Sequence, residues 1–293
     1  MILAFTGFTT HLFIVYLLPL CILHSGSIFN GAYMTTEREQ TYSLLKSVTV
    51  DCKDDGKTFQ VTDRIKVICD YLKTTSFQLL AQEDLFLLFG KKTPAKGEPV
   101  VLLSSHIDCV YQRCFCTEGT DTYQGTFDNS FTNAALLHVM KHCSLPDNVL
   151  IAFTGDEEHD SAGAVAVNVY LTRQQHPIQF ALVLDVTNAG WEKQHLFAIE
   201  NDLGIDLLTA HRIIETVKPY EGKYTFLHRA EPDETWDYDE YDIPCMTLSA
   251  PVGGRMHGEE GVLVRKDTFS VYCDVLGLLA QVLTRQMVEQ QAF

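Results

Sequence analysis

Four runs of consecutive apolar residues stand out from residue 99 onward, and turn-forming or polar residues bound each of them. They predict fully buried β-strands, because a strand covered on both faces shows no polar alternation. The runs are Pro99–Ser105, Asn148–Gly155, Phe180–Val186 and Ile243–Ala250. Between and after them, apolar residues recur every three or four positions. This spacing predicts helices over Asn133–His142, Ser161–Arg173 (with Asp160 and Ser161 at its N-terminal cap), Leu203–Val217 and Asp267–Val288.

Upstream of these runs, the sequence predicts one more helix and a hairpin. The apolar spacing in "TDRIKVICDYL" (Thr62–Leu72) is helical, and "FQLLAQ" and "DLFLLFG" are two strands joined by a short turn. Buried strands that alternate with helices are typical of a parallel sheet with helices on both faces. The expected fold is therefore α/β, with three α/β/α layers around a mixed, mostly parallel central sheet.

Residues 34–293 are predicted to form a single domain, since no internal repeat, low-complexity tract or Pro/Gly/Ser-rich linker divides them. The chain has 293 residues, of which 46% are hydrophobic, so it can bury a sizeable core. Its net charge of −16 at pH 7 leaves no basic stripe to neutralise phosphates. Composition therefore excludes nucleic acid as a partner and leaves the oligomeric state undetermined.

Residues 1–33 are expected to lie outside this domain. No charged residue precedes Glu37, and "LFIVYLLPLCIL" (Leu12–Leu23) has the length of a signal-peptide core rather than of a membrane span. Two interpretations stay open: a degenerate signal or anchor, or a mis-assigned start with Met34 as the true first residue. Only the first implies a membrane. The nine scattered cysteines favour a reducing, cytoplasmic compartment over an exported location.

Polar side chains of metal-binding types follow the predicted strands at the point where each strand ends. In a largely parallel sheet, ligand sites form beyond the carboxyl ends of the strands. One further residue of this kind lies just ahead of a helix, in "GTFDN". The set comprises His106 and Asp108 in "HID", Asp128, Glu157 and Glu158 in "DEE", Asp185, and His257 after the last strand.

Two histidines and several carboxylates, without a thiolate, form a site suited to Zn²⁺, Co²⁺ or Mn²⁺. Two such ions about 3.5–4 Å apart hold a hydroxide between them and polarise a carbonyl. A further carboxylate must then take the proton from water and pass it to the leaving amine. Glu157 and Glu158 can divide these tasks, because adjacent side chains at a strand end point in different directions. Asp108 can accept the imidazole N–H of His106 and fix its tautomer.

The order His-x-Asp, Asp-Asn, Glu-Glu, Asp, His resembles that of the co-catalytic two-zinc exopeptidases, the superfamily of bacterial leucyl aminopeptidase and the carboxypeptidase G-type enzymes. The resemblance extends over roughly residues 60–285. It implies a zinc-peptidase fold and two divalent metal ions, Zn²⁺ first, with Co²⁺ or Mn²⁺ as alternatives. It also implies these roles: His106 and Asp185 bind one metal, Glu158 and His257 bind the other, Asp128 bridges them, Glu157 is the general base and Asp108 orients His106.

The number of residues between the motifs is most similar to that of the compact, lidless aminopeptidase family, which also contains the glutaminyl cyclases and glutamate carboxypeptidase II. The interval from His106 to Asp128 is too short for the domain that tetrahedral aminopeptidases insert there. The interval from Asp185 to His257 is too short for a dimerisation lid. One departure is "DNSFTNAA" after Asp128, where relatives often carry a glycine-containing stretch.

The resemblance implies an aminopeptidase that hydrolyses N-terminal residues of peptides or small amides with a metal-bridged hydroxide. Alternatives on the same fold are a carboxypeptidase, an N-acyl-amino-acid amidohydrolase, a single-metal cyclase and a catalytically silent scaffold. The acidic, aromatic segment Glu231–Pro244 reads either as a solvated loop or as a specificity rim. In the second case Asp233 or Glu234 pairs with the substrate α-ammonium, and Trp236 or Tyr238 bounds a side-chain pocket.

Overall fold

The computed structural model describes residues 30–50, 62–111 and 113–290. The chain separates into two units, Met1–Glu37 and Arg38–Phe293, and the sheet and the candidate site belong to the second. The apolar segment 1–33 lies outside the described residues except for its last four, which begin helix α1 (Asn30–Val48). Across the described ranges, no helix combines the length and the apolar character that a membrane crossing needs.

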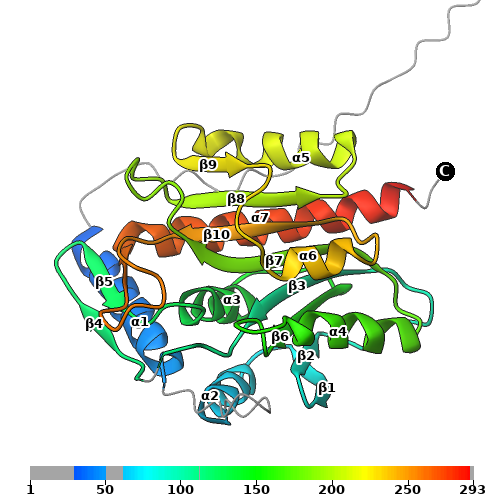
Figure 1. Cartoon of the computed structure of the whole chain (residues 1–293), viewed down its shortest axis with the longest axis horizontal. Helices are drawn as coiled ribbons and strands as arrows, with labels where there is room; N and C mark the ends of the chain where they lie inside the picture. The colour runs from blue at the N-terminus through cyan, green and yellow to red at the C-terminus, as the bar shows by residue number, and fades with distance from the viewer. Residues whose placement is uncertain (1–29, 51–61, 112, 291–293) are drawn as a thin grey trace, which may run out of the picture. The chain divides into compact units, whose positions relative to one another are not determined.

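An eight-stranded mixed sheet forms the centre of the second unit (Figure 1). Four central strands run parallel, and antiparallel pairings join β2 to β6, β1 to β2 and β8 to β10, while β9 lies parallel to β8 at the edge. In spatial order the strands are β1 (Gln78–Glu83), β2 (Phe86–Gly90), β6 (Val149–Thr154), β3 (Val100–His106), β7 (Ile178–Thr187), β10 (Cys245–Pro251), β8 (Phe197–Leu203) and β9 (Tyr224–Leu227).

Helices cover both faces of this sheet, which confirms the predicted three-layer α/β/α fold. One face packs against α3 (Ser130–His142), α5 (Leu207–Val217) and α7 (Lys266–Gln290), with α2 (Thr62–Leu72) beside α3. The other face packs against α4 (Ala162–Arg173) and α6 (Glu234–Asp239). Alternate residues of β3 enter the two cores: Val101 and Leu103 face α3 and α7, whereas Val100 and Leu102 face α4 and α6.

The four buried strands, the hairpin and the helices over 62–72 and 161–173 are confirmed, with ends shifted by a few residues. The helix predicted to start at Leu203 was wrong in its first turn. Leu203 ends β8, and α5 begins only at Leu207, because the side chain of Asp206 accepts hydrogen bonds from the N–H groups of Leu208 and Thr209. Ser161 does precede α4, but its side chain makes no capping hydrogen bond.

A second, three-stranded sheet was not predicted. It consists of β11 (Val262–Arg265), β5 (Thr122–Gly125) and β4 (Cys116–Glu118), and it lies at the left of Figure 1. Val262 of β11 pairs with Gly125 of β5. Because Asp128 follows β5 and His257 precedes β11, this small sheet fixes the loops that carry two of the predicted site residues.

The contact between β5 and β11 depends on Gly261, and we predict that Gly261→Ala is strongly destabilising. Gly261 has φ +64°, and a Cβ there would lie 2.4 Å from the carbonyl oxygen of Gly125. Gly97 is the matched control, since its φ is +79° and a Cβ would meet nothing within 4 Å. Gly97→Ala should cost about 1 kcal/mol for the left-handed backbone alone, and Gly261→Ala about 2 kcal/mol more because backbone must also move.

Urea unfolding followed by far-ultraviolet circular dichroism measures both losses in the free energy of unfolding. Equal losses for the two variants would contradict a tight β5–β11 contact.

Candidate metal centre

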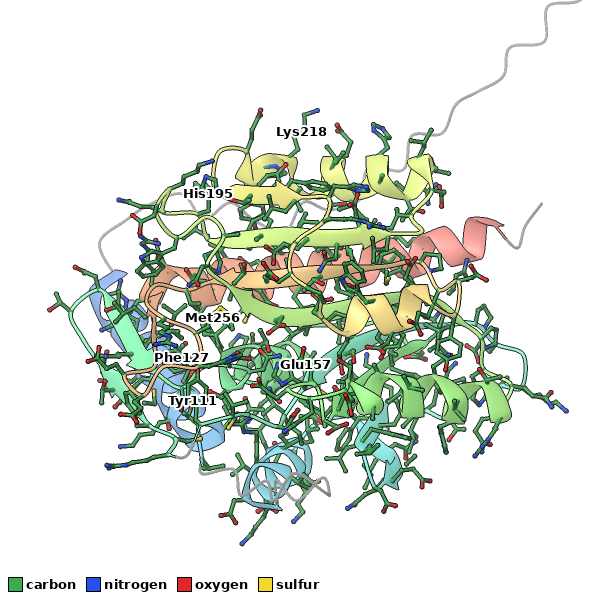
Figure 2. All side chains as sticks on the ribbon, in the orientation of Figure 1. Tyr111, Phe127, Glu157, His195, Lys218 and Met256 are labelled. Carbon is green, nitrogen blue, oxygen red and sulfur yellow. The ribbon has the colours of Figure 1, made fainter. Side chains whose placement is uncertain are left out.

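All seven residues singled out in the sequence lie together at the carboxyl edge of the parallel strands. His106 ends β3, Asp185 is near the end of β7, and Glu157 and Glu158 follow β6 in the turn before α4. The loops flanking the small sheet contribute Asp128 and His257. In Figure 2, Glu157 lies near the centre of the view, with Met256 and Tyr111 to its left. The rule that ligands bind beyond the carboxyl ends of strands therefore holds in this sheet.

Asp128 is the centre of the group, because its two oxygens face two different imidazoles. Its Oδ1 lies 3.3 Å from Nε2 of His106, and its Oδ2 lies 3.0 Å from Nε2 of His257. His106 Nε2 is also 3.6 Å from Asp185 Oδ1, and His257 Nε2 is 3.3 Å from Glu158 Oε2. Two ligand-type groups result, His106–Asp128–Asp185 and Asp128–Glu158–His257, and within each the offered atoms lie within 4.8 Å of one another.

The adjacent acids Glu157 and Glu158 both reach this centre from the same turn. Glu157 Oε2 lies 3.7 Å from His106 Nε2, and His106, Glu157 and Glu158 form a third compact group. The side chain of Glu158 is only 4% exposed, whereas that of Glu157 is 16% exposed. Glu157 is thus the more open of the two carboxylates toward the cavity.

Asp108 connects the histidine at the end of β3 to the acidic turn. Its Oδ1 lies 3.4 Å from His106 Nδ1, on the opposite side of the ring from the metal-type cluster. Its Oδ2 accepts a hydrogen bond of 3.2 Å from the backbone N–H of Glu158. Asp108 therefore holds the ring of His106 and the backbone of Glu158 in a fixed relation.

Three further side chains fix the strand ends, and the sequence analysis did not predict their roles. Arg64 of α2 is fully buried, and its Nη1 donates to the carbonyl of Ile107, between His106 and Asp108. At the start of α3, Asn133 Nδ2 donates to the carbonyl of His106, and Asn129 Nδ2 donates to that of Leu184, next to Asp185. The departure "DNSFTNAA" supplies both asparagines and was the one available signal.

The carboxylates of the centre carry an electrostatic cost. Burial, reinforced by the other carboxylates of the centre, raises the pKa of Glu157 and of Glu158 to about 8 and that of Asp185 to about 7. Burial also acts against ionised Asp128, but the two imidazoles outweigh it and hold the pKa of Asp128 well below its usual range. The hydrogen bond to Asp128 raises the pKa of His257 to about 9.

The side chains present fit divalent cations. His106 Nε2 and Glu158 Oε1 are buried without a hydrogen-bond partner in the described part of the chain. Buried polar atoms are normally satisfied, and ligation of a cation would satisfy both. Two imidazoles and hard carboxylate oxygens are a donor set for Zn²⁺, Co²⁺ or Mn²⁺.

A cavity of about 750 Å³ opens beside the centre. Asp128, Glu157, Glu158, Asp185 and His257 line one end of it. The rest of the cavity is lined by residues of β8, β9, β10 and the segment between β9 and α6, among them Glu200, Leu227, Ser249, Arg229 and Asp233.

The segment Glu231–Pro244 is neither a solvated loop nor wholly a rim, because it contains α6. Glu234 and Tyr238 are buried beneath the sheet, so their predicted places at a pocket rim were wrong. Both form hydrogen bonds with Ser104. The Ser104 hydroxyl donates to the carboxylate of Glu234, and Tyr238 Oη donates to Ser104 Oγ. Trp236 is 39% exposed and packs against the guanidinium of Arg229. Asp233 does line the cavity.

Solved structures of aminopeptidases superpose on this fold. The TET aminopeptidase of a marine-sediment Thaumarchaeota archaeon superposes with a TM-score of 0.65 at 10% identity, covering 84% of this chain and 99% of that one. An aminopeptidase from the archaeon Desulfurococcus kamchatkensis superposes with a TM-score of 0.64 at 11% identity, covering 84% of this chain and 97% of that one. The LapA aminopeptidase of Legionella pneumophila superposes with a TM-score of 0.62 at 12% identity, covering 85% of this chain and 71% of that one. The chain therefore has the zinc-aminopeptidase fold.

No curated protein matches the sequence. A family profile does match, and the matched range, residues 88–263, contains all seven side chains of the centre and more than half of the chain. The chain belongs to peptidase family M28.

Proposed function

We propose that the protein is an aminopeptidase that removes N-terminal residues from peptides with the help of two divalent cations, zinc in the first instance. The observation that carries the proposal is the position of Asp128, which belongs to two ligand-type groups at once. One carboxylate shared between two groups is what a two-metal site requires.

His106 and Asp185 would hold one cation, Glu158 and His257 the other, and Asp128 both. When bound, the cations would polarise the scissile carbonyl and lower the pKa of the attacking water. The protein supplies the orientation of the ligands: Asp108 holds the ring of His106, and Arg64 and Asn133 hold the backbone on either side of it.

Glu157 is proposed as the general base. It is the less buried carboxylate of the pair and lies beside His106 at the cavity. It would take a proton from the attacking water and donate that proton to the amine of the leaving group. Both transfers need a carboxyl group whose pKa is higher than usual. Burial raises the pKa of Glu157 above its ordinary value.

The charge of the cavity favours a free amine over a free carboxylate as the recognised terminus. Beyond the centre, the ionisable residues among the described part of its lining are the acids Glu200, Glu231 and Asp233 and one cation, Arg229. An acidic wall attracts an α-ammonium group and repels an α-carboxylate. This supports an aminopeptidase over a carboxypeptidase.

We predict that Glu157→Gln keeps the metals and loses the activity. Wild-type protein should bind about two metal ions per chain, and the variant should bind the same number. Turnover of an aminoacyl-p-nitroanilide panel should fall by about 10²–10⁴-fold, because only the proton carrier is removed. Elemental analysis and initial rates on the same preparations give both numbers.

Asp160→Asn is the matched control, since Asp160 is an exposed acid of the same turn. It should leave both metal content and rate unchanged. Undiminished activity in Glu157→Gln would overturn the role of Glu157, and wild-type protein without bound metal would overturn the proposal itself.

A second prediction concerns pH in the metal-free protein. The folded state holds protons on Glu157 and Glu158 up to about pH 8, whereas their ordinary pKa is 4.5. Between these values the folded state binds more protons than the unfolded state, so stability must fall as pH rises. The pKa of His257 is raised from 6.5 to about 9, so this residue also makes stability fall as pH rises.

The Tm of the metal-free protein should therefore drop by on the order of 5 °C between pH 5 and pH 8. Added Zn²⁺ should raise Tm more at pH 8 than at pH 6, since protons compete with the metal for the ligands. Differential scanning calorimetry in chelator and in Zn²⁺ tests this, with Asp160→Asn as the control for general charge. A Tm that rises with pH in chelator would refute it.

A further inference from the structure

The cavity follows a row of polar side chains that crosses the sheet away from the metal centre. On β10, Ser249 pairs with Asp185 of β7, and Thr247 pairs with Glu200 of β8. Their neighbours Leu184, Leu248 and Ile199 enter the core against α3 and α7. Alternation along the strands therefore places Asp185, Ser249 and Glu200 on the opposite face, where the cavity lies.

Glu200 is the buried acid at the far end of this row. The residue is 5% exposed, yet it lines the cavity. Its Oε1 accepts a hydrogen bond of 3.1 Å from Thr187 Oγ1, and its Oε2 accepts one of 2.6 Å from Ser249 Oγ. Both partners are neutral hydroxyls, and no Lys, Arg or His of the described chain forms an ion pair with Glu200.

A carboxylate in this setting has capacity for a cationic ligand. Its two oxygens offer about four acceptor positions, and the hydroxyls occupy two. A buried charge without a counter-charge is costly, and a positively charged group that enters the cavity would offset that cost. The two hydroxyls also fix the direction of the carboxylate, so little conformational entropy would be lost on binding.

Outside the metal centre, the other charged lining residues are exposed or engaged elsewhere. Glu231 is exposed. Asp233 caps α6 and accepts hydrogen bonds from Thr235, Asn201 and Thr247. Arg229 is exposed and lies over the ring of Trp236, 5.5 Å from its centroid. Glu200 is thus the buried acid of the cavity wall, outside the metal centre, whose partners leave acceptor positions open.

We infer that Glu200 binds the cationic side chain of an N-terminal lysine or arginine, which makes basic residues the preferred substrates. The inference rests on the proposed aminopeptidase function. Glu200 lies two strands from Asp185, and its carboxylate bonds Ser249, the residue of β10 that pairs with Asp185. A long basic side chain can therefore extend from the metal centre to this carboxylate. Val186, Ala189 and Leu227 line the same cavity and can pack along its aliphatic stem.

The test compares lysine with norleucine, which shares the stem and the α-ammonium but lacks the side-chain charge. Calorimetry measures the Kd of L-lysinamide and L-norleucinamide for the metal-loaded protein. Initial rates give kcat/KM for the two aminoacyl-p-nitroanilides. Wild-type protein should favour lysine at least about 10-fold in both, as a charge-assisted hydrogen bond implies.

Glu200→Gln should abolish this preference, because it weakens the binding and turnover of the lysine compounds far more than those of the norleucine compounds. Ser249→Ala, which removes one hydroxyl from the carboxylate, should reduce the preference partially, and it serves as the second variant if Glu200→Gln does not fold. Glu215→Gln, an equal charge change on exposed α5, is the control and should match wild type.

Norleucine bound and cleaved as well as lysine by wild-type protein would overturn the inference while leaving the aminopeptidase proposal intact. A preference that survives Glu200→Gln would also overturn it. Tighter binding of lysinamide with no hydrolysis of either anilide would support the role of Glu200 and reject the aminopeptidase activity.

Discussion

Mutual repulsion among buried carboxylates at one edge of the sheet is the constraint on which the rest of this structure depends. Asp128, Glu157, Glu158 and Asp185 lie around two imidazoles, and burial raises the pKa of three of the four acids. Such a group is stable when protons or cations neutralise it. The surrounding contacts keep these side chains together against that repulsion. Arg64 of α2 and Asp108 hold the backbone at the ends of β3 and β6, and the small β4–β5–β11 sheet holds the loops of Asp128 and His257.

The two faces of the central sheet have different chemistry near its carboxyl edge. Toward α3 and α7 the strands present an apolar core. Toward α6 they present hydroxyls that hold carboxylates: Ser104 bonds Glu234, Thr247 bonds Asp233, and Ser249 bonds Glu200. This polar floor extends from beneath the metal centre to the end of the cavity. One sheet register therefore orients both the proposed chemistry and the proposed recognition of the substrate side chain.

Family membership and local geometry answer different questions. The match to peptidase family M28 over residues 88–263 gives the reaction class. Solved aminopeptidases at 10–12% identity share the fold and say nothing of side-chain preference. Preference must come from residues outside the shared motifs, and Glu200 is such a residue: it lies on an antiparallel strand away from the metal centre, yet it faces the same cavity.

The sequence alone determined the parts that depend on local patterns. Continuous apolar runs identified the four buried strands, and the rule for parallel sheets then placed His106, Glu157, Glu158 and Asp185 at one edge. Tertiary structure decided the parts that depend on partners distant in the chain. β8 was missed because Glu200, Asn201 and Asp202 interrupt its apolar pattern, and Glu200 is tolerated there only because Thr187 and Ser249 supply hydroxyls. The β5–β11 pairing, the burial of Glu234 and the role of Arg64 likewise arise from long-range hydrogen bonds, which no local pattern encodes.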